Sequence, residues 1–281
     1  MCDLKLFVSC HQPFFVPEHP FLVPVQVGTA LRESRFEGFC HDDEGENISS
    51  KNLSYCELTA LYWAWKNVSA KAYGLFHYRR YLYPDCREKQ PYRMEKEPQL
   101  SLLEQLDFDR LGDLAEQYDL ILPKGENMYL SVREHYASAP YHHKKDLDLV
   151  EQIIRERWPE YVPAMDAYLS QSICYFGNIC IMKKDVLQDY CSWLFDILSA
   201  FDDRCDMTGY GVQEKRVNGY LAERLLGVYS FHHRQDLSIL ELPRLHFEPD
   251  DKVRRKRKQI NFLLPPGSKR RMLIKKYMRR K

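Results

Sequence analysis

Two arginines stand at the end of a short apolar segment, in the sequence His77-Tyr78-Arg79-Arg80. The apolar residues before them predict a strand over 72–78, and ligands of open α/β sheets bind beyond the carboxyl ends of strands. Guanidinium groups bind phosphate oxygens in pairs, so Arg79 and Arg80 suit a diphosphate. His77 suits a hydrogen bond to a phosphate, or a metal ion. A surface cluster of ion pairs is the alternative use of the same residues.

A second polar segment joins adjacent carboxylates to a glycine, an asparagine and a serine. Its candidate ligand groups are Asp42, Asp43, Asn47 and Ser49. Such oxygen-rich groups suit a divalent cation, or the hydroxyls of a sugar or a ribose. Asn47 and Ser49 equally suit turn formation and helix capping, so a structural role stays open. The segment lacks the alternating ligand spacing of an EF-hand loop.

Three further polar residues complete the candidate site. Asn178 lies in the apolar run 175–182, where a buried amide must find hydrogen-bond partners in the core or in a ligand. Glu223 lies near the start of a predicted helix, and a carboxylate placed there in a pocket is a candidate acid or base. The solvated side of that helix is the alternative for Glu223. Asn218 opens the same helix and joins Asn178 as a candidate contact to a sugar.

Strands and helices alternate along the part of the chain that carries these residues. Strands are expected over 5–10, 72–78, 118–123, 172–182 and 238–242. Helices are expected over 55–66, 107–117, 146–158, 184–201 and 218–229. The proline-containing stretch 13–45 has little periodicity and is expected to be irregular. The alternation predicts an α/β fold, with a mainly parallel mixed sheet and helices on both faces.

The first of these helices has the clearest sequence pattern. Its apolar residues recur at spacings of three and four from Leu58 to Trp65, which is typical of one buried helix face. Asn52 or Ser54 is expected to cap its amino end, and Glu57 follows Ser54 at the spacing of a capping box.

Length and composition point to a single globular unit with an appendage. The chain has 281 residues, of which 44% are hydrophobic and 29% charged. No apolar run approaches the ~20 residues of a transmembrane helix, and the amino end does not have the pattern of a signal peptide. The nine cysteines are scattered, which favours reduced thiols. A cytoplasmic location is therefore expected.

Charge is distributed unevenly along the chain. Residues 252–281 contain 14 lysines and arginines and no carboxylate, so the remainder carries 27 basic and 40 acidic residues. We expect a domain over 1–250 and a basic tail over 251–281. The tail suits an anionic membrane surface, while a flexible solubilising tail is the alternative. Nucleic acid is not an expected partner, because no other part of the chain resembles a nucleic-acid module.

Several segments occur together in an order that resembles bacterial capsular and exopolysaccharide glycosyltransferases, first catalogued as a domain of unknown function. The segments that carry the resemblance are 9–13, 24–28, 42–49, 55–67, 74–81, 178–184, 190–198 and 219–226. The resemblance covers roughly residues 5 to 247, which is nearly everything except the basic tail. Each segment alone is a weak signal, whereas their joint order is specific.

The resemblance implies a single nucleotide-sugar-binding domain of the A-type glycosyltransferase architecture. It implies a nucleotide-sugar donor, a UDP-hexose with galactose as the leading choice, and a glycan acceptor on a lipid carrier. Many A-type enzymes hold Mn²⁺ or Mg²⁺ with an Asp-x-Asp motif at a strand end, and no such motif follows the strand over 72–78. Asp107 and Asp109 match the letters but fall where a helix is expected to begin. The metal ligands are therefore unknown.

The resulting hypothesis divides the candidate residues between nucleotide and chemistry. His11 and Gln12, which follow the first strand, would bracket the nucleotide and sugar together with the loop 42–49. Arg79 and Arg80 would hold the diphosphate.

The remaining residues would serve the sugar and the proton. Glu223 and His77 are the candidate catalytic residues, the first as acid or base and the second as a phosphate donor or metal ligand. Asn178 and Asn218 would contact the donor or acceptor sugar. The basic tail would place the enzyme on the inner face of the cell membrane. Two rival functions stay open: a non-catalytic nucleotide- or carbohydrate-binding module of a polysaccharide assembly complex, and a membrane-surface adaptor.

Overall fold

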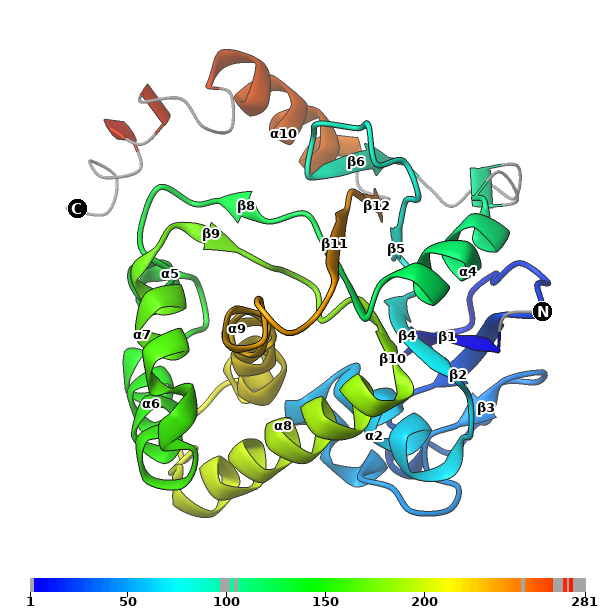
Figure 1. The fold of residues 1–281 in the computed structure, drawn as a ribbon, viewed down its shortest axis with the longest axis horizontal. Coiled ribbons are helices and arrows are strands. Elements are labelled where there is room, and N and C mark those ends of the chain that lie inside the picture. The colour runs from blue at the N-terminus through cyan, green and yellow to red at the C-terminus, as the bar shows by residue number, and fades with distance from the viewer. Residues whose placement is uncertain are drawn as a thin grey trace.

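The structure is a computed structural model in which residues 3–96, 102–103, 106–248, 251–264, 270–271 and 273–274 are described. Its centre is a large mixed sheet whose main path runs in the order β11-β7-β10-β4-β1-β2-β3 (Figure 1). Within the described residues, no helix is long and apolar enough to cross a membrane.

The order of the strands reverses at the middle of the sheet. β1 (Leu4–Cys10) pairs in parallel with β2 (Leu22–Gln26) on one side and with β4 (Ala72–His77) on the other. β3 (Cys40–His41) continues the parallel arrangement beyond β2. The chain therefore moves outward in both directions from β1. In open α/β sheets, such a switch point leaves a crevice beyond the carboxyl ends of the two strands.

The other half of the sheet contains one reversed strand. β10 (Cys180–Lys183) runs antiparallel to β4 on one side and to β7 (Leu120–Pro123) on the other. β11 (Ile239–Leu242) pairs in parallel with β7 at the edge. The prediction of a mainly parallel mixed sheet is confirmed for this path.

A small extension continues from β4 beyond the switch point. β5 (Arg80–Leu82) turns back from β4, and β12 (Arg244–Phe247) pairs with both β5 and β6 (Tyr92–Glu95). A separate two-stranded sheet joins β8 (Glu126–Asn127) to β9 (Ile173–Cys174).

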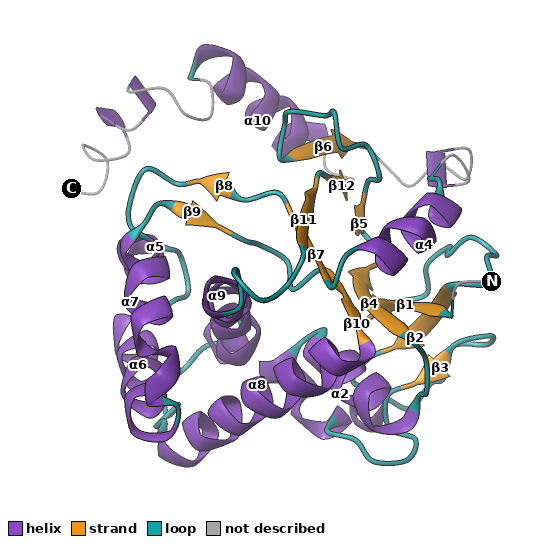
Figure 2. Cartoon of the chain, viewed as in Figure 1, coloured by secondary structure: helices purple, strands orange, loops and turns teal. Residues whose placement is uncertain are grey.

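Helices cover both faces of the sheet, and two apolar cores fill the layers between them (Figure 2). Successive side chains of a strand point to opposite faces of the sheet, so β1 contributes to both cores. Leu6 and Val8 lie in one core and Phe7 lies in the other. α4 (Phe108–Gln117) packs on the face of Leu6 and Val8. Each fully buried side chain of this size contributes about 1.5–3 kcal/mol of hydrophobic stabilisation.

The opposite face carries most of the helical residues. The helices on this side are α2 (Leu58–Asn67), α5 (Val132–Ser138), α6 (Lys144–Arg157), α7 (Val162–Ser170), α8 (Lys184–Arg204) and α9 (Val217–His232). They share the larger core with Phe7. In Figure 1, α9 lies between the α5–α7 group and the sheet, so its side chains can reach both.

The remaining elements are short or lie at the carboxyl end. Four 3-10 turns are η1 (Thr29–Leu31), η2 (Ser49–Lys51), η3 (Pro159–Tyr161) and η4 (Glu214–Arg216). α1 (Asn52–Tyr55) precedes α2, and α10 (Asp251–Leu263) begins the basic tail. The expected domain boundary falls next to residues 249–250, which lie outside the described residues, as do 265–269, 272 and 275–281 of the tail.

Three local predictions were wrong. The stretch 13–45 contains β2 and β3, because strands that pair inside a sheet need no internal periodicity when both faces are covered. The expected helix over 55–66 is divided between α1 and α2 at Cys56, whose φ is 52°. The expected strand over 172–182 is divided between β9 and β10, and Asn178 lies between them with a φ of 50°.

The division at Cys56 also removes the expected cap. Lys51 occupies the cap position of α1 and Glu57 that of α2, and neither side chain makes a capping hydrogen bond. Asn52 instead donates to the carbonyl oxygen of Cys56 at 2.7 Å and to the hydroxyl of Thr59 at 3.0 Å. The Asn52 amide therefore joins the two helices, and the Glu57 carboxylate is available for other contacts.

Candidate functional site

A cavity of about 390 Å³ opens beyond the carboxyl ends of β1 and β4 and is called here the β1–β4 pocket. Its lining residues are Ser9, His11, Val27, Arg32, Asn52, Leu53, Cys56, Glu57, His77, Arg79, Arg80, Val212 and Arg216. Four arginines and two histidines face one carboxylate there. The strand order creates this crevice, and the residues that line it give it a positive charge.

The arginines of the β1–β4 pocket are largely free of protein partners. Among the described residues, the guanidinium groups of Arg32, Arg79 and Arg80 make no ion pair. Arg79 lies over the ring of Tyr78, at 5.3 Å from its centroid. Arg216 donates from Nε to Sγ of Cys56 at 3.3 Å. This set of guanidinium groups is suited to an anionic ligand, since four of them face a single carboxylate, that of Glu57.

The two histidines of the pocket are held in the neutral form. Burial, followed by the charges of Arg80 and Arg79, lowers the pKa of His77 well below its ordinary value. Burial, followed by the charges of Arg79, Arg32 and Arg216, also lowers the pKa of His11. The two rings lie 6.2 Å apart between centroids. The positive charge of the arginines therefore contributes to the lowered pKa values of both histidines.

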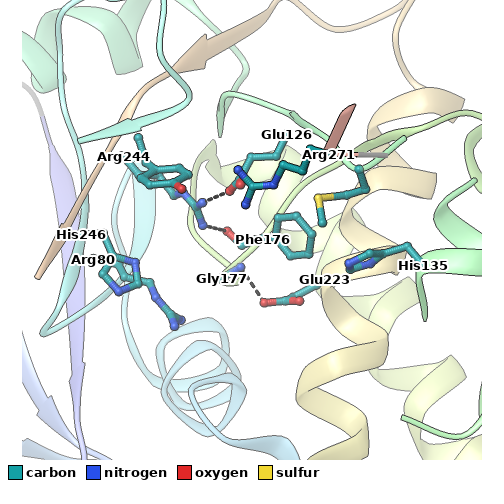
Figure 3. A pocket seen from close by; sticks show the side chains of 11 residues that line it. Arg80, Glu126, His135, Phe176, Gly177, Glu223, Arg244, His246 and Arg271 are labelled. Atoms are coloured by element: carbon teal, nitrogen blue, oxygen red, sulfur yellow. Dashed lines mark hydrogen bonds and ion pairs between the residues drawn. The ribbon is translucent and has the colours of Figure 1, made fainter. Parts of the chain in front are cut away.

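A second cavity of about 380 Å³ lies between β12 and α9 and is called here the β12–α9 pocket (Figure 3). Its lining residues are Arg80, Tyr92, Glu126, Met128, His135, Phe176, Gly177, Glu223, Arg244, His246 and Arg271. They come from eight elements or loops and from the basic tail. Two aromatic rings and a methionine give it apolar surface, and carboxylates, histidines and arginines give it polar groups.

Glu223 reaches the β12–α9 pocket from α9 with its orientation fixed. One carboxylate oxygen accepts a hydrogen bond from the backbone N–H of Gly177 at 2.7 Å, and the other pairs with Arg224 at 2.6 Å. The Arg224 side chain is only 3% exposed and lies over the rings of Tyr136 and Phe176. A buried cation with this packing holds the carboxylate of Glu223 at the pocket wall.

Arg80 lines both pockets and joins them. It begins β5, and its side chain passes Gly177, where an added Cβ would lie 3.4 Å from Arg80 Cδ and 3.5 Å from Arg244 Nη1. Gly177 has a φ of 96°, which glycine adopts without strain. Burial lowers the pKa of Arg80, and the charges of Glu57 and Glu223 act in the opposite direction. Arg80 therefore remains a cation, with one carboxylate on each side of it.

Asn178 connects the walls of the two pockets. Its amide nitrogen donates to Glu57 at 2.8 Å and to the carbonyl oxygen of Gly219 at 3.0 Å, which fixes the orientation of the amide. Its amide oxygen is buried without a partner among the described residues. Burial raises the pKa of Glu57, and the hydrogen bond from Asn178 partly offsets that effect.

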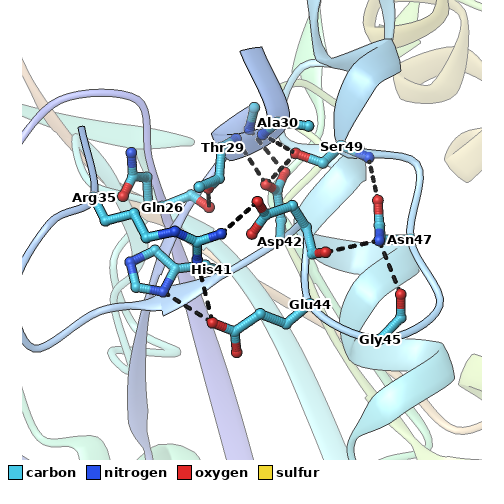
Figure 4. A network of polar contacts seen from close by, with 12 residues as sticks. Gln26, Thr29, Ala30, Arg35, His41, Asp42, Glu44, Gly45, Asn47 and Ser49 are labelled. Atoms are coloured by element: carbon cyan, nitrogen blue, oxygen red, sulfur yellow. Dashed lines mark hydrogen bonds and ion pairs between the residues drawn. The ribbon is translucent and has the colours of Figure 1, made fainter. Parts of the chain in front are cut away.

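The acidic loop after β3 has a structural task (Figure 4). The buried Asp42 carboxylate accepts the backbone N–H groups of Gly28 and Thr29 at 2.8 and 3.0 Å, and the Ser49 hydroxyl at 2.5 Å. Ser49 in turn accepts the N–H of Ala30 at 3.1 Å. These bonds fix η1, the turn that precedes Arg32 of the β1–β4 pocket.

The other two residues of that loop act in the same way. Asp43 pairs with Arg35 at 2.7 Å, and Asn47 donates to the carbonyl oxygens of Asp43 and Gly45 at 2.9 Å. Their predicted role as direct ligands is not supported by either pocket, because neither residue lines one. The structural alternative that the sequence left open describes their contacts.

The structure brings some predicted residues together and separates others. His11, His77, Arg79 and Arg80 meet in the β1–β4 pocket, while Glu223 meets Arg80 in the β12–α9 pocket. Gln12 is exposed and lines neither pocket.

Asn218 has a different neighbourhood. It donates to Asp202 at 2.7 Å, and Asp202 also accepts from Tyr55 and pairs with Lys51. These contacts join α8 and α9 to α1 and place Asn218 in the packing of the helices.

Sequence reasoning missed several residues that line the pockets. Arg32 and Arg216 belong to segments without a recognisable motif, and they reach the β1–β4 pocket only through the tertiary fold. Tyr92, Glu126 and Arg244 reach the β12–α9 pocket in the same way. The sequence pattern predicts that Glu57 is a capping residue, because it follows Ser54 at the spacing of a capping box. At three residues from an expected cap, Glu57 gives no sequence signal that distinguishes a capping residue from a residue that lines a pocket.

A metal centre is not evident in the described part of the chain, where no three histidine, cysteine or carboxylate side chains cluster as metal ligands. Asp107 caps α4 by accepting the N–H of Arg110 at 2.8 Å, as its place at a helix start predicts. Asp109 lies in the first turn of the same helix and faces His19 at 3.6 Å. The letters Asp-x-Asp therefore do not form a cation site here.

The sheet is mixed and mainly parallel, with a switch point at β1 and helices on both faces, and it defines an open α/β domain with an arginine-rich crevice beyond β1 and β4. The chain has 32% identity to the solved apo structure of WbbM, a bifunctional glycosyltransferase, with a TM-score of 0.82 over 88% of this chain. The match covers 45% of the WbbM chain, so this protein spans less than half of that one. No curated protein matches the sequence.

Residues 5–234 match a family described as a domain of unknown function, DUF4422. Because the match extends over most of the sequence, the chain belongs to this family. The expected glycosyltransferase-like fold is thereby confirmed, and the protein is structurally similar to a glycosyltransferase.

Proposed function

We propose that the protein transfers a hexosyl unit from a nucleoside diphosphate sugar to a hydroxyl group of a glycan acceptor, in the synthesis of a capsular or other surface polysaccharide. The donor is a UDP-sugar, with UDP-galactose as the leading choice. The likeness to WbbM supports the reaction class, and the resemblance in the sequence motifs supports the donor and the pathway.

The observation that carries the proposal is the set of unpaired arginines at the switch point. Arg32, Arg79 and Arg80 converge with Arg216 on one crevice and have no ion-pair partner among the described carboxylates there. A diphosphate supplies the missing negative charge and accepts bidentate hydrogen bonds from guanidinium groups. The same cations stabilise the charge that develops on the diphosphate as it leaves.

In the proposed reaction, the bond between the anomeric carbon and the diphosphate oxygen breaks, and its electron pair leaves on the diphosphate. The acceptor oxygen forms the new bond to the anomeric carbon, and its proton passes to a carboxylate. Glu223 is suited to this role because its side chain is fixed at the pocket wall by Gly177 and Arg224. Arg80 lies where the two pockets meet, and there it faces the breaking bond.

His77 is proposed as a hydrogen-bond donor to the diphosphate. Its Nδ1 accepts the backbone N–H of Arg79, and the ring is neutral, so its proton is on Nε2. A protonated nitrogen cannot ligate a metal ion. Mn²⁺ or Mg²⁺ bound to the donor would supply further charge neutralisation, and no step depends on it here.

The basic tail is proposed to bind an anionic membrane surface, where a lipid-linked acceptor is available. Lys252, Arg255 and Lys256 of α10 are exposed, and the exposed fractions of Phe262 and Leu263 are 86% and 70%. Exposed apolar residues beside a dense positive charge suit insertion into the headgroup region of a bilayer. The protein would then act as a peripheral enzyme on the inner face of the cell membrane.

A thermal-shift titration with UDP, GDP, UDP-galactose and UDP-glucose, each with and without Mn²⁺, tests the donor site. A ligand at 100 times its Kd adds about 2.7 kcal/mol to the free energy of unfolding, which raises Tm measurably. We expect UDP and its sugars to raise Tm, and we expect Arg79→Ala to abolish that rise while its own Tm stays near that of the wild type. No rise with any nucleotide would reject the donor site and favour a membrane-surface adaptor.

Turnover separates an enzyme from a binding module. We expect the protein to convert UDP-galactose to UDP in the presence of a lipid-linked glycan acceptor. Nucleotide binding without turnover under these conditions would favour a non-catalytic module of a polysaccharide assembly complex.

A further inference from the structure

We propose that the β12–α9 pocket is the binding site of the acceptor and that it takes a sugar ring. The inference rests on the proposed function and assigns a ligand class to a cavity that the sequence did not reveal.

The lining of the β12–α9 pocket matches the two kinds of surface on a sugar ring. A hexose has an apolar face of C–H groups and a rim of hydroxyl groups. Tyr92, Phe176 and Met128 provide apolar surface, while Glu126 and Glu223 provide carboxylates that accept hydrogen bonds from hydroxyls. A cavity of about 380 Å³ has room for a sugar ring.

The two carboxylates of this pocket are paired with arginines, which distinguishes it from the β1–β4 pocket. Arg244 pairs with Glu126 and donates to the carbonyl oxygen of Phe176 at 2.8 Å. Glu223 pairs with the buried Arg224. Both carboxylates therefore have counter-charges, and Arg80 and Arg271 also line the pocket, where arginines outnumber carboxylates by three to two. The unpaired arginines of the β1–β4 pocket suit an anion.

The wall between the pockets has a buried group that still needs a donor. Asn178 is 4% exposed, and its amide oxygen has no partner among the described residues. The amide cannot reverse, because its nitrogen already donates to Glu57 and to the carbonyl oxygen of Gly219. Asn178 itself lines neither pocket. Asn178 directly follows Gly177, which lines the β12–α9 pocket.

The position of the basic tail indicates that the β12–α9 pocket binds the acceptor and not the sugar of the donor. Arg271 of the basic tail lines the β12–α9 pocket, whereas no described tail residue lines the β1–β4 pocket. Figure 3 shows Arg271 beside Glu126, on the side of the pocket opposite Arg80. A glycan presented from a membrane that the tail contacts would therefore enter at Arg271 and end near Arg80. The reacting hydroxyl would meet the donor at Arg80, which both pockets share.

Saturation-transfer NMR with octyl glycosides of galactose, glucose and mannose tests this assignment in the full chain. The first variants are Tyr92→Ala and Phe176→Leu, which remove aromatic surface from the pocket at two independent places. The matched control is Phe15→Ala, because Phe15 is 46% exposed and lines neither pocket. Arg79→Ala alters the other pocket alone. Far-ultraviolet circular dichroism verifies that each variant is folded.

We expect at least one octyl glycoside to bind the wild type, with its Kd raised at least tenfold in Tyr92→Ala and Phe176→Leu. In Phe15→Ala and Arg79→Ala, the Kd should stay within twofold of the wild type. Absence of binding by all three glycosides overturns the assignment, and so does an unchanged Kd in both pocket variants.

The response to UDP is measured on the same proteins and separates the two proposals. If UDP and UDP-galactose both raise the Tm of Tyr92→Ala as much as that of the wild type, the pocket does not hold the donor sugar and the acceptor assignment stands. If the UDP-galactose response falls in Tyr92→Ala while the UDP response stays, the pocket holds the donor sugar and the acceptor assignment fails. If UDP has no effect on the wild type while a glycoside binds, the donor site fails and the sugar pocket stands.

Discussion

The backbone N–H of Arg79 donates to Nδ1 of His77 at 3.2 Å, and this bond determines which ring nitrogen carries the proton. Because the pKa of His77 is lowered well below its ordinary value, the ring is neutral and Nε2 is a donor. The contact is local, between residues two apart. It nevertheless leaves an N–H donor beside the arginines of the β1–β4 pocket, as the proposed contact to a phosphate oxygen requires.

The first prediction concerns this donor. His77→Gln places an amide N–H near the position of Nε2, whereas His77→Asn places its amide near Nδ1. We expect His77→Gln to retain most of the affinity for UDP. The Kd of His77→Asn should rise about 3- to 10-fold, because one neutral hydrogen bond contributes about 0.5–1.5 kcal/mol. Isothermal titration calorimetry measures both, and equal losses in the two variants would contradict a donor at Nε2.

The second prediction compares two adjacent carboxylates. Asp42 is buried and accepts three hydrogen bonds, so Asp42→Ala leaves two backbone N–H groups and the Ser49 hydroxyl without their acceptor. We expect the free energy of unfolding to fall by about 3 kcal/mol or more. Asp43→Ala removes an ion pair with the exposed Arg35 and should cost less than about 1 kcal/mol.

Urea denaturation of Asp42→Ala and Asp43→Ala gives the two free energies of unfolding directly. A metal- or sugar-binding role for the acidic loop predicts the reverse result, with small stability changes and a loss of ligand response in both variants. UDP titrations below the transition temperature distinguish these outcomes.

The third prediction concerns pH and His142. Burial, followed by the charge of Arg224, lowers the pKa of His142 to about 4. The unfolded chain binds a proton near pH 6.5, so between pH 6.5 and 4 the unfolded state carries more protons than the native state. This group therefore makes the free energy of unfolding decrease as the pH falls through that window.

The variant His142→Phe removes the titration and preserves a ring against Tyr220, whose centroid lies 4.1 Å from that of His142. Its free energy of unfolding should depend less on pH between 6.5 and 4 than that of the wild type. Denaturation at four pH values measures the slope. An unchanged slope would show that other groups cause the acid sensitivity.

The fourth prediction tests the membrane surface. Replacing Lys252, Arg255 and Lys256 by glutamine removes three exposed charges from α10. At about 1 kcal/mol for each basic residue, binding to vesicles that contain phosphatidylglycerol should weaken about 100-fold or more. Co-sedimentation measures the change, and binding by the wild type should fall as salt is added.

The control replaces three exposed lysines of the folded domain, Lys71, Lys89 and Lys184, by glutamine. This variant has the same net charge as the α10 variant. If the two variants bind vesicles equally, the attraction depends on overall charge and the tail has no specific role.

Much of the sheet could be predicted because its strands carry their own signals. The segments before Cys10, His77 and Pro123 are short apolar runs that end in turn or polar residues, and each is a strand. The predicted helix over 55–66 and the predicted strand over 172–182 were wrong because each is interrupted by a residue with an unusual backbone conformation, which hydrophobic periodicity does not indicate. Cys56 and Asn178 have positive φ values, and these residues interrupt a helical and an apolar pattern that otherwise continue.

The candidate site could be predicted only as far as adjacent residues determine it. His77, Arg79 and Arg80 lie together in the sequence and in the pocket. Arg32 and Arg216 are separated from them by dozens of residues and meet them through the order of strands and helices. Contacts between residues so far apart depend on the order and direction of the strands and helices. The sequence pattern predicts the individual strands and helices but does not predict how they are arranged.

Arg80 couples the two pockets electrostatically. Because its guanidinium group borders both pockets, a diphosphate bound beside it would neutralise a charge that the other pocket also experiences. Occupancy of one pocket would thus alter the electrostatic potential in the other without any movement of the backbone. A bound nucleotide would then reduce the positive potential that Arg80 exerts in the β12–α9 pocket.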